Sequence, residues 1–313
     1  MKNNIVIIVL GPTGVGKTGV SIKLATALRT EIISADSMLI YKGMDIATAK
    51  PTNKERQKIK HHLIDILEPD QGFSAGMFYQ QATEIIDRLH RQKKIPLVVG
   101  GTGLYIKTLT KGLFQGPDTD WAFREELALL EKQHGKGYLY NLLKKIDEQS
   151  ALSLNRQNQR RIIRALEVRL KTDKNTKEIQ SETYSPPYNF LKIGLTRERH
   201  ELYRLINERV DNMIKSGLVE ETKDLLSKHP GQTAMQAIGY KEICLYLKGK
   251  LSFEEAVNLL KQRSRNYAKR QYTWFRKEPD IHRVDVSGSY KADEIFQKVL
   301  DDVAILKTFL ALW

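Results

Sequence analysis

Residues 9–19, VLGPTGVGKTG, contain side chains and backbone groups suited to binding phosphate. Gly11, Gly16, Lys17 and Thr18 match the pattern G-x-x-x-x-G-K-[ST], whose glycines permit a tight turn that points backbone N–H groups at phosphate oxygens. Lys17 adds a positive charge, and the Thr18 hydroxyl is suited to hold Mg²⁺, the cofactor that we expect. The residues expected to bind a diphosphate or nucleotide are Gly11, Pro12, Thr13, Gly14, Val15, Gly16, Lys17 and Thr18.

A triphosphate-hydrolysing protein normally has a second strand that ends in an acidic residue, which organises Mg²⁺ and the attacking water. The best candidate strand here, residues 96–101, ends in glycines and is followed by Thr102. The first acidic residue after the phosphate loop is instead Asp36, at the expected tip of another strand. Its carboxylate could accept a proton from a nucleophile, or it could cap a helix or turn. Thr102 could donate a hydrogen bond to the same substrate or be an ordinary turn residue.

Alternating strand and helix patterns predict the fold. A helical pattern follows the phosphate loop, and Ser74 is the expected N-cap of a second helix, whose apolar face comprises Phe78, Ala82, Ile85, Ile86 and Leu89. The expected strands are residues 4–10, 31–35, 62–67, 96–101, 190–196 and 280–286. This order predicts an α/β fold with a P-loop-type doubly wound parallel sheet, whose ligands bind outside the carboxyl ends of the strands.

The pattern changes between residues 118 and 184, where helical periodicity continues without a strand signal. We therefore expect an all-helical domain, residues 118–186, inserted into an α/β core that comprises residues 1–117 and 187–313. Residues 197–277 are again helical, and a closing helix is expected to run to Trp313. Its apolar residues are expected to pack against the protein and not to enter a membrane.

The composition indicates a polyanionic partner. Fifty-one Lys and Arg against 37 Asp and Glu leave a net charge of +14, which favours nucleic acid or an anionic membrane surface, although basic proteins without such partners exist. The single cysteine, Cys244, excludes an internal disulfide framework and a cysteine-based zinc site, and His61 and His62 are expected to be structural. The N-terminal apolar run is too short for a signal peptide or a membrane span, so we expect a cytoplasmic protein.

Two basic segments are candidates for contact with nucleic acid. In residues 155–170, Arg156, Arg160 and Arg164 share one helical face, and the segment contains a single acidic residue, Glu167, which favours phosphate contact over a solvated surface. Residues 263–277 combine six basic residues with aromatic ones and contain no acidic residue. Such a segment can grip a backbone and stack on bases, but its aromatic residues alone are expected to lie in the core.

These motifs together resemble the tRNA dimethylallyltransferase family in its bacterial form, also called tRNA isopentenyltransferases. The matching stretches run in order from Gly11 to Lys277: GPTGVGKT, ISADSMLIYKGMDIATAKP, HHLID, LVVGGTGLYI, QRRIIRALEV, AIGYKEI with YLKG, and AKRQYTWFRK. Ala47 stands where relatives usually have glycine, which puts the local backbone geometry in question. The C-terminal zinc finger of eukaryotic relatives is missing.

The resemblance implies transfer of a dimethylallyl group from dimethylallyl diphosphate to N6 of the adenosine that is 3′-adjacent to the anticodon, with release of diphosphate. Asp36 would be the general base, with Thr102 at the same reaction centre, and Arg209 would lie near the diphosphate. The residues that the resemblance assigns to tRNA binding are Asp36, Ser37, Met38, Leu39, Arg124, Gln159, Arg160, Arg161, Ile162 and Ile163. The expected partners are the anticodon stem-loop of tRNA and dimethylallyl diphosphate, without a membrane, and the protein is expected to be a monomer.

Two other functions remain open at this point. A P-loop kinase of a small metabolite or nucleotide would use the helical insertion as a lid, and it would consume ATP without regard to RNA. A non-catalytic RNA-binding P-loop protein would bind tRNA and form no product.

Overall fold

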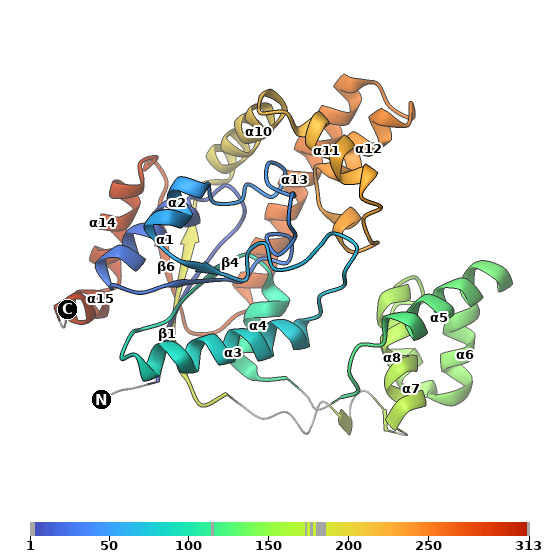
Figure 1. Cartoon of the computed structure of the whole chain (residues 1–313). Coiled ribbons are helices and arrows are strands. Elements are labelled where there is room, and N and C mark those ends of the chain that lie inside the picture. The colour runs from blue at the N-terminus through green and yellow to red at the C-terminus, as the bar shows by residue number, and fades with distance from the viewer. Residues whose placement is uncertain (1–3, 114–115, 173, 176–177, 180–185, 312–313) are drawn as a thin grey trace. The chain divides into compact units, whose positions relative to one another are not determined.

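The computed structural model describes residues 4–113, 116–172, 174–175, 178–179 and 186–311. The chain divides into two compact units, one made of Met1–Lys107 with Pro187–Trp313 and the other of Thr108–Pro186. The first unit contains a sheet flanked by helices, and the second is a bundle of helices (Figure 1). Residues 118–186, the expected insertion, lie in the second unit, whose start at Thr108 falls inside helix α4 (Gly103–Lys111).

The sheet has six parallel strands in the order β3-β2-β4-β1-β5-β6, which confirms the predicted doubly wound α/β fold. The central strand β1 is flanked by β4 on one side and by β5 on the other, so the chain reverses its direction of winding at β1. The strands are β1 (Ile5–Leu10), β2 (Ile32–Ser34), β3 (His61–His62), β4 (Leu97–Gly100), β5 (Asn189–Thr196) and β6 (Ile281–Asp285).

The third strand differs from the prediction. We expected a strand over residues 62–67, but the strand is His61–His62, and Leu63 and Asp65 adopt positive φ angles of 59° and 54° that end it. Leu67 forms only an isolated bridge with Tyr41. The apolar residues after His62 are therefore part of an irregular segment and not of the sheet.

Helices cover both faces of the sheet. Ile7 and Val9, on one face of β1, belong to a buried cluster with residues of α1 and α14, while α3 and α4 lie on the opposite side of the sheet in Figure 1. The helices of this unit besides α4 are α1 (Lys17–Ala27), α2 (Asn53–Lys58), α3 (Ala75–Arg91), α10 (Arg199–Lys215), α11 (Leu218–Ser227), the 3₁₀ turn η1 (Ala234–Gln236), α12 (Tyr240–Leu247), α13 (Phe253–Arg276), α14 (Ala292–Asp302) and α15 (Ile305–Leu310).

Helix α3 begins where the sequence predicted, because the Ser74 side chain accepts a hydrogen bond of 3.1 Å from the Met77 amide. Its predicted apolar face is buried, except that Ile85 is only half-buried.

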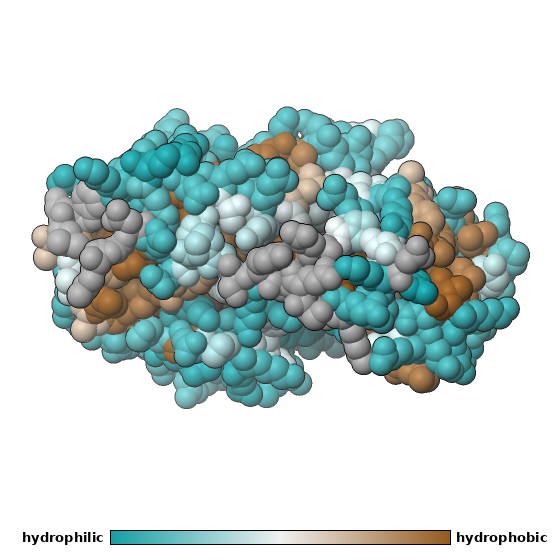
Figure 2. Space-filling view, turned by 90° about the horizontal axis from the view of Figure 1, so that it is seen from below, coloured by the Kyte–Doolittle hydropathy of each residue, from teal (hydrophilic) through white to brown (hydrophobic). Residues whose placement is uncertain are grey.

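The closing segment is two helices, α14 and α15, and not one continuous helix to Trp313, since the chain leaves the helical conformation at Val303. Residues 312–313 lie outside the described residues. Leu306 and Phe309 are buried in the core, as expected of a packed end. No helix in the described part of the chain is long and apolar enough to span a membrane. In Figure 2 hydrophilic residues cover most of the face shown.

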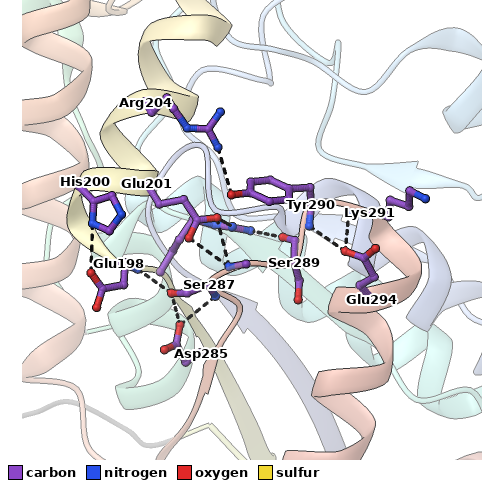
Figure 3. A network of polar contacts seen from close by, with 12 residues as sticks. Glu198, His200, Glu201, Arg204, Asp285, Ser287, Ser289, Tyr290, Lys291 and Glu294 are labelled. Atoms are coloured by element: carbon purple, nitrogen blue, oxygen red, sulfur yellow. Dashed lines mark hydrogen bonds and ion pairs between the residues drawn. The ribbon is translucent and has the colours of Figure 1, made fainter.

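Helix α10 is fixed at its start by a polar network with the turn between β6 and α14 (Figure 3). Arg197 and Glu201 form a buried ion pair, and Arg197 also donates to the carbonyl oxygen of Ser289 at 2.6 Å. Glu201 accepts a hydrogen bond of 3.1 Å from the Gly288 amide. Because Arg197, Glu201 and Ser289 are buried, this network sets the direction of α10, which carries Arg209, from its first turn.

The second unit contains α5 (Trp121–His134), α6 (Tyr138–Ile146), α7 (Glu148–Ser153) and α8 (Gln159–Thr172), and the described residues of this unit include no strand. Residues 173, 176–177 and 180–185 of the expected insertion lie outside the described residues. Leucine and isoleucine side chains of α5, α6 and α8 form its core.

A buried carboxylate joins α5 to α8 in this unit. Glu167 is fully buried and accepts hydrogen bonds from Arg124 Nη2 at 2.6 Å, from the Asp120 amide at 2.9 Å and from Arg164. Burial raises the pKa of Glu167, but these hydrogen bonds outweigh burial and hold the pKa below its usual value.

Glu167→Ala should therefore destabilise the protein by about 3–5 kcal/mol, because two partly buried guanidinium groups lose their shared carboxylate. Calorimetric unfolding measures the loss. The contribution of Glu167 is present near neutral pH and disappears as the pH falls through its lowered pKa, so the difference from the wild type should shrink in acid. The matched control is Glu148→Ala, which removes an exposed partner of Lys144 and should cost less than about 1 kcal/mol. Equal losses for the two variants would contradict this assignment.

Candidate active site

A cavity of about 300 Å³ lies at the carboxyl ends of the strands, where the fold predicted a ligand site. The loop after β1 contributes Thr13, Lys17 and Thr18, and the end of β2 contributes Ser34 and Asp36. Helices α10 and α13 form another part of the wall, and their residues lie more than 150 positions after those of the first loop and β2 in the chain. All of its walls belong to the first unit.

The expected phosphate loop connects the end of β1 to the start of α1. Gly16 directly precedes α1 with a φ of 108°, a left-handed conformation that few other residues adopt, and a Cβ there would lie 2.7 Å from Ile295 Cδ1. Lys17 Nζ donates to the carbonyl oxygens of Gly11 at 2.9 Å and Pro12 at 2.8 Å. The Val15 side chain is buried in the core, so Val15 can meet a ligand only through its backbone.

Three cationic side chains, Lys17, Arg209 and Arg270, and one carboxylate, Asp36, line the cavity. Burial lowers the pKa of Lys17 to about 8, the charge of Asp36 opposes this shift, and the charge of Arg209 adds to it. Burial also lowers the pKa of Arg209, and Asp36 again opposes the shift. The predicted placement of Arg209 with Lys17 at one cavity is therefore present in the structure, with the Arg209 guanidinium 3.4 Å from the carbonyl oxygen of Thr48.

Asp36 and Thr102 are brought together by the ends of β2 and β4. Asp36 Oδ1 accepts a hydrogen bond of 2.9 Å from the Met38 amide, and Thr102 Oγ1 accepts one of 3.1 Å from the Ser37 amide. The Thr102 amide donates to the carbonyl oxygen of Ala35 at 3.2 Å. Ser37, Met38 and Leu39, which the resemblance assigns to tRNA binding together with Asp36, line the cavity beside it.

Helix α13 contributes residues that the sequence did not identify. Tyr267 and Gln271 line the cavity, and Tyr267 lies close to Thr102. Burial raises the pKa of Tyr267, and the charge of Asp36 adds to the shift. The prediction that the aromatic residues of this segment are core is thus right for the buried Phe275 and wrong for Tyr267. The missed signal is the spacing of Tyr267, Gln271 and Phe275 by four residues, which places a glutamine on a buried helical face.

The segment after Asp36 forms another wall, and Glu221 of α11 holds it. The Glu221 carboxylate accepts hydrogen bonds from the amides of Asp45 at 3.1 Å and Ile46 at 2.9 Å, and from the Tyr240 hydroxyl at 2.5 Å. The following residues, including Ala47, line the cavity. A Cβ on Gly239 would lie 2.6 Å from the Ala47 methyl carbon, so the alanine is accommodated by a glycine opposite it.

The candidate tRNA residues of the second unit fall into two groups. Gln159, Arg160 and Arg161 are exposed at the start of α8. Ile162 and Ile163 are buried in the core of the unit, so any RNA contact at these two positions would have to be made by the backbone and not by the side chains.

Arg124 is held by Glu167 and has a side-chain exposure of 25%, and Arg164 is hydrogen-bonded to the same carboxylate. The structure therefore gives Arg124, expected at the RNA, a structural role in its own unit.

The donor set of the cavity fits Mg²⁺. Thr18 and Ser34 both line it, and the buried Ser34 hydroxyl has no hydrogen-bond partner among the described residues. Mg²⁺ prefers hard oxygen donors, and is usually held by one or two protein groups together with substrate phosphates and water. Over the same part of the chain, no group of three His, Cys, Asp or Glu side chains is placed to hold a metal. His61 Nδ1 lies 2.7 Å from the carbonyl oxygen of Ile59 and His62 Nε2 lies 2.5 Å from Glu31, so both have protein partners.

Comparison with known proteins agrees with this geometry. The family model described as IPP transferase matches residues 39–278. A tRNA dimethylallyltransferase of Thermodesulfovibrio yellowstonii is 52% identical over 307 residues, which cover 96% of this chain and 97% of that protein. This chain belongs to the IPP transferase family. Another relative, the tRNA dimethylallyltransferase of Halothermothrix orenii, is 48% identical over 92% of this chain and 90% of its own length.

Solved structures of similar proteins share the IPP transferase fold. The tRNA isopentenylpyrophosphate transferase of Bacillus halodurans is 40% identical, with a TM-score of 0.71 and coverage of 99% of both chains. A eukaryotic dimethylallyltransferase acting on tRNA is 30% identical, with a TM-score of 0.78, and covers 96% of this chain and 77% of its own.

The lowered pKa of Lys17 leads to a prediction for phosphate binding. In the protein without ligand, Lys17 is positively charged below pH 8. Above pH 8 it is mostly neutral and must take up a proton before its charge can attract an anion. The quantity to compare is the affinity of the wild type for inorganic pyrophosphate divided by the affinity of Lys17→Ala at the same pH, because this ratio removes the titration of pyrophosphate itself. The ratio should fall above pH 8 by up to about tenfold per pH unit. Titration calorimetry measures it. Lys17→Arg, whose charge does not titrate in this range, should give a flat ratio, and an equally steep fall in this variant would refute the role of Lys17.

Proposed function

We propose that this chain transfers a dimethylallyl group from dimethylallyl diphosphate to N6 of the adenosine 3′-adjacent to the anticodon in tRNA. In this reaction the amine nitrogen forms a bond to C1 of the dimethylallyl group, the bond from C1 to the diphosphate oxygen breaks, and the amine loses a proton. The observation that carries the proposal is one cavity that combines a phosphate loop, three cationic side chains and the Asp36 carboxylate in a member of this family.

The phosphate loop is suited to hold the leaving diphosphate. Lys17, Arg209 and the N-terminus of α1 together provide positive potential where negative charge develops as the bond breaks. Bound Mg²⁺, held by Thr18 and the diphosphate, would neutralise further charge. The apolar side chains of Ile206, Val210 and Leu260 in the same cavity are suited to the dimethylallyl group.

Asp36 is suited to be the general base. The exocyclic amine of adenine is a weak nucleophile, so its attack requires a positioned proton acceptor. Asp36 Oδ1 is fixed by the Met38 amide, which orients the carboxylate toward the cavity that it lines. Thr102 and Tyr267 lie beside Asp36 and are suited to form hydrogen bonds with the adenine base.

The tRNA must present its adenosine outside the base stack for N6 to enter a cavity of this size. Ser37, Met38 and Leu39 line the cavity next to Asp36 and would contact the extruded base. In the second unit, Gln159, Arg160 and Arg161 form an exposed group at a helix N-terminus, where backbone phosphates bind favourably. One chain provides the whole cavity, which supports action as a monomer.

One incubation separates this proposal from a kinase and from a non-catalytic RNA-binding protein. The protein is mixed with Mg²⁺, labelled dimethylallyl diphosphate and unmodified tRNA, and the nucleosides of the tRNA are then separated. Labelled N6-dimethylallyladenosine is the expected product. ATP turnover that ignores RNA would favour the kinase, and tight tRNA binding without product would favour the binding protein.

Asp36→Asn should reduce turnover by about two to four orders of magnitude and leave tRNA affinity largely unchanged. Asparagine retains the Oδ1 acceptor for the Met38 amide but cannot accept the proton. Single-turnover rates and a tRNA binding titration measure the two effects. Asp70→Asn, an exposed aspartate of the same unit, is the matched control. Weakened tRNA binding with normal turnover at saturation would exclude Asp36 as the base.

Arg160→Ala should weaken tRNA binding. It should also make the slope of log binding constant against log salt concentration shallower by about one, because one fewer counterion is released on binding. The dissociation constant is measured at several salt concentrations. Lys144→Ala removes the same charge from an exposed residue paired with Glu148, and its slope should match the wild type. If Arg160→Ala also retains the wild-type slope, the start of α8 is not an RNA contact.

A further inference from the structure

The side chain of Gln271 in α13 lies between the two loops of the active site. The Thr13 amide of the phosphate loop donates to Gln271 Oε1 at 2.9 Å, and Gln271 Nε2 donates to the carbonyl oxygen of Gly101 at 2.8 Å. Gln271 has an exposed fraction of 5%, so solvent does not compete effectively for these groups. One side-chain amide therefore bridges segments that are far apart in the sequence.

Each end of this bridge continues into a different part of the proposed reaction. On one side, Thr13 belongs to the loop whose carbonyl oxygens hold Lys17. On the other side, Gly101 precedes Thr102, whose amide and hydroxyl are bound to the residues on either side of Asp36. The bridge thus links the leaving-group end of the site to the end that carries the proton acceptor.

The bridge requires the amide group itself. Thr13 needs an acceptor and Gly101 needs a donor, and a glutamine side chain supplies one of each. The contact with Gly101 is close, because a Cβ on that residue would lie 2.2 Å from Gln271 Nε2. A glutamate would turn a second acceptor toward the Gly101 carbonyl oxygen, and a leucine would leave both backbone groups without this partner.

We propose that Gln271 is a positioning residue that fixes the separation of the phosphate loop and the Asp36–Thr102 pair, an inference that rests on the proposed transfer reaction. Although Gln271 lines the cavity, both polar atoms of its side chain are bound to the backbone, so we assign it no contact with the reacting atoms. Its effect is on the geometry of the bound substrates, where a displacement of about 1 Å can reduce a rate by about 100-fold. The groups assigned above to the diphosphate alone and to the tRNA alone do not include Gln271, so the binding of each substrate by itself should change little.

The test is the split between rate and affinity in Gln271→Leu. We expect kcat to fall by about 10- to 100-fold, with affinities for inorganic pyrophosphate and tRNA within about threefold of the wild type. Gln262→Leu, an exposed glutamine on the same helix, is the matched control, and thermal melting shows that the variants are folded. A kcat within threefold of the wild type overturns the proposal, as does a loss of pyrophosphate affinity as large as the loss of kcat, which would make Gln271 a binding residue.

Gln271→Glu provides a second, independent readout. A protonated glutamic acid has one donor and one acceptor like the amide, and an ionised one has acceptors only. The kcat of this variant, divided by that of the wild type at each pH, should therefore rise as the pH falls, while the ratio for Gln271→Leu stays flat. Equal profiles for both variants would overturn the proposal. If the wild type itself forms no dimethylallylated tRNA, the proposed function fails, whereas a working wild type with unaffected variants rejects only the role of Gln271.

Discussion

The close approach of the ends of β2 and β4 is the constraint on which the site depends. A Cβ on Gly100 would lie 2.2 Å from the carbonyl oxygen of Ala35, so only glycine allows the two strand ends to come this close. Thr102, two residues after Gly100, then forms hydrogen bonds with Ala35 and Ser37, the residues on either side of Asp36. A parallel sheet brings strand ends to one edge, and here the lack of a side chain on Gly100 lets the segments that carry Asp36 and Thr102 lie against each other.

Charge gives this cavity two distinct ends. The phosphate loop places Lys17 where burial lowers its pKa, and Asp36 partly compensates the cost of keeping it charged. Arg209 comes from α10, whose start is anchored by the buried Arg197–Glu201 pair, and this pair is not part of the cavity lining. An anionic substrate therefore relieves a repulsion between two cations when it binds, while the carboxylate side remains suited to a neutral amine that must lose a proton.

The sequence predicted the elements better than it predicted what they bring together. β-branched runs identified five strands closely, and the phosphate loop and Asp36 follow from local spacing. Gln271 and Glu221 could not be located in this way, since their partners lie 258 and 175 residues away in the chain. Their contacts depend on how α11 and α13 pack over the sheet, and no local pattern encodes that.

The helical unit shows the limit of a family motif that is carried over as a continuous stretch. Residues 159–163 form one matching run, yet a helix turns its side chains by 100° per residue, so Ile162 and Ile163 face the core and Arg160 and Arg161 face solvent. The arginines divide in the same way, because Arg164 and Arg124 neutralise the buried Glu167. A surplus of positive charge therefore does not mark every arginine as a contact for RNA. The cations at the N-terminus of α8 are exposed instead, and the helix dipole adds to their positive potential.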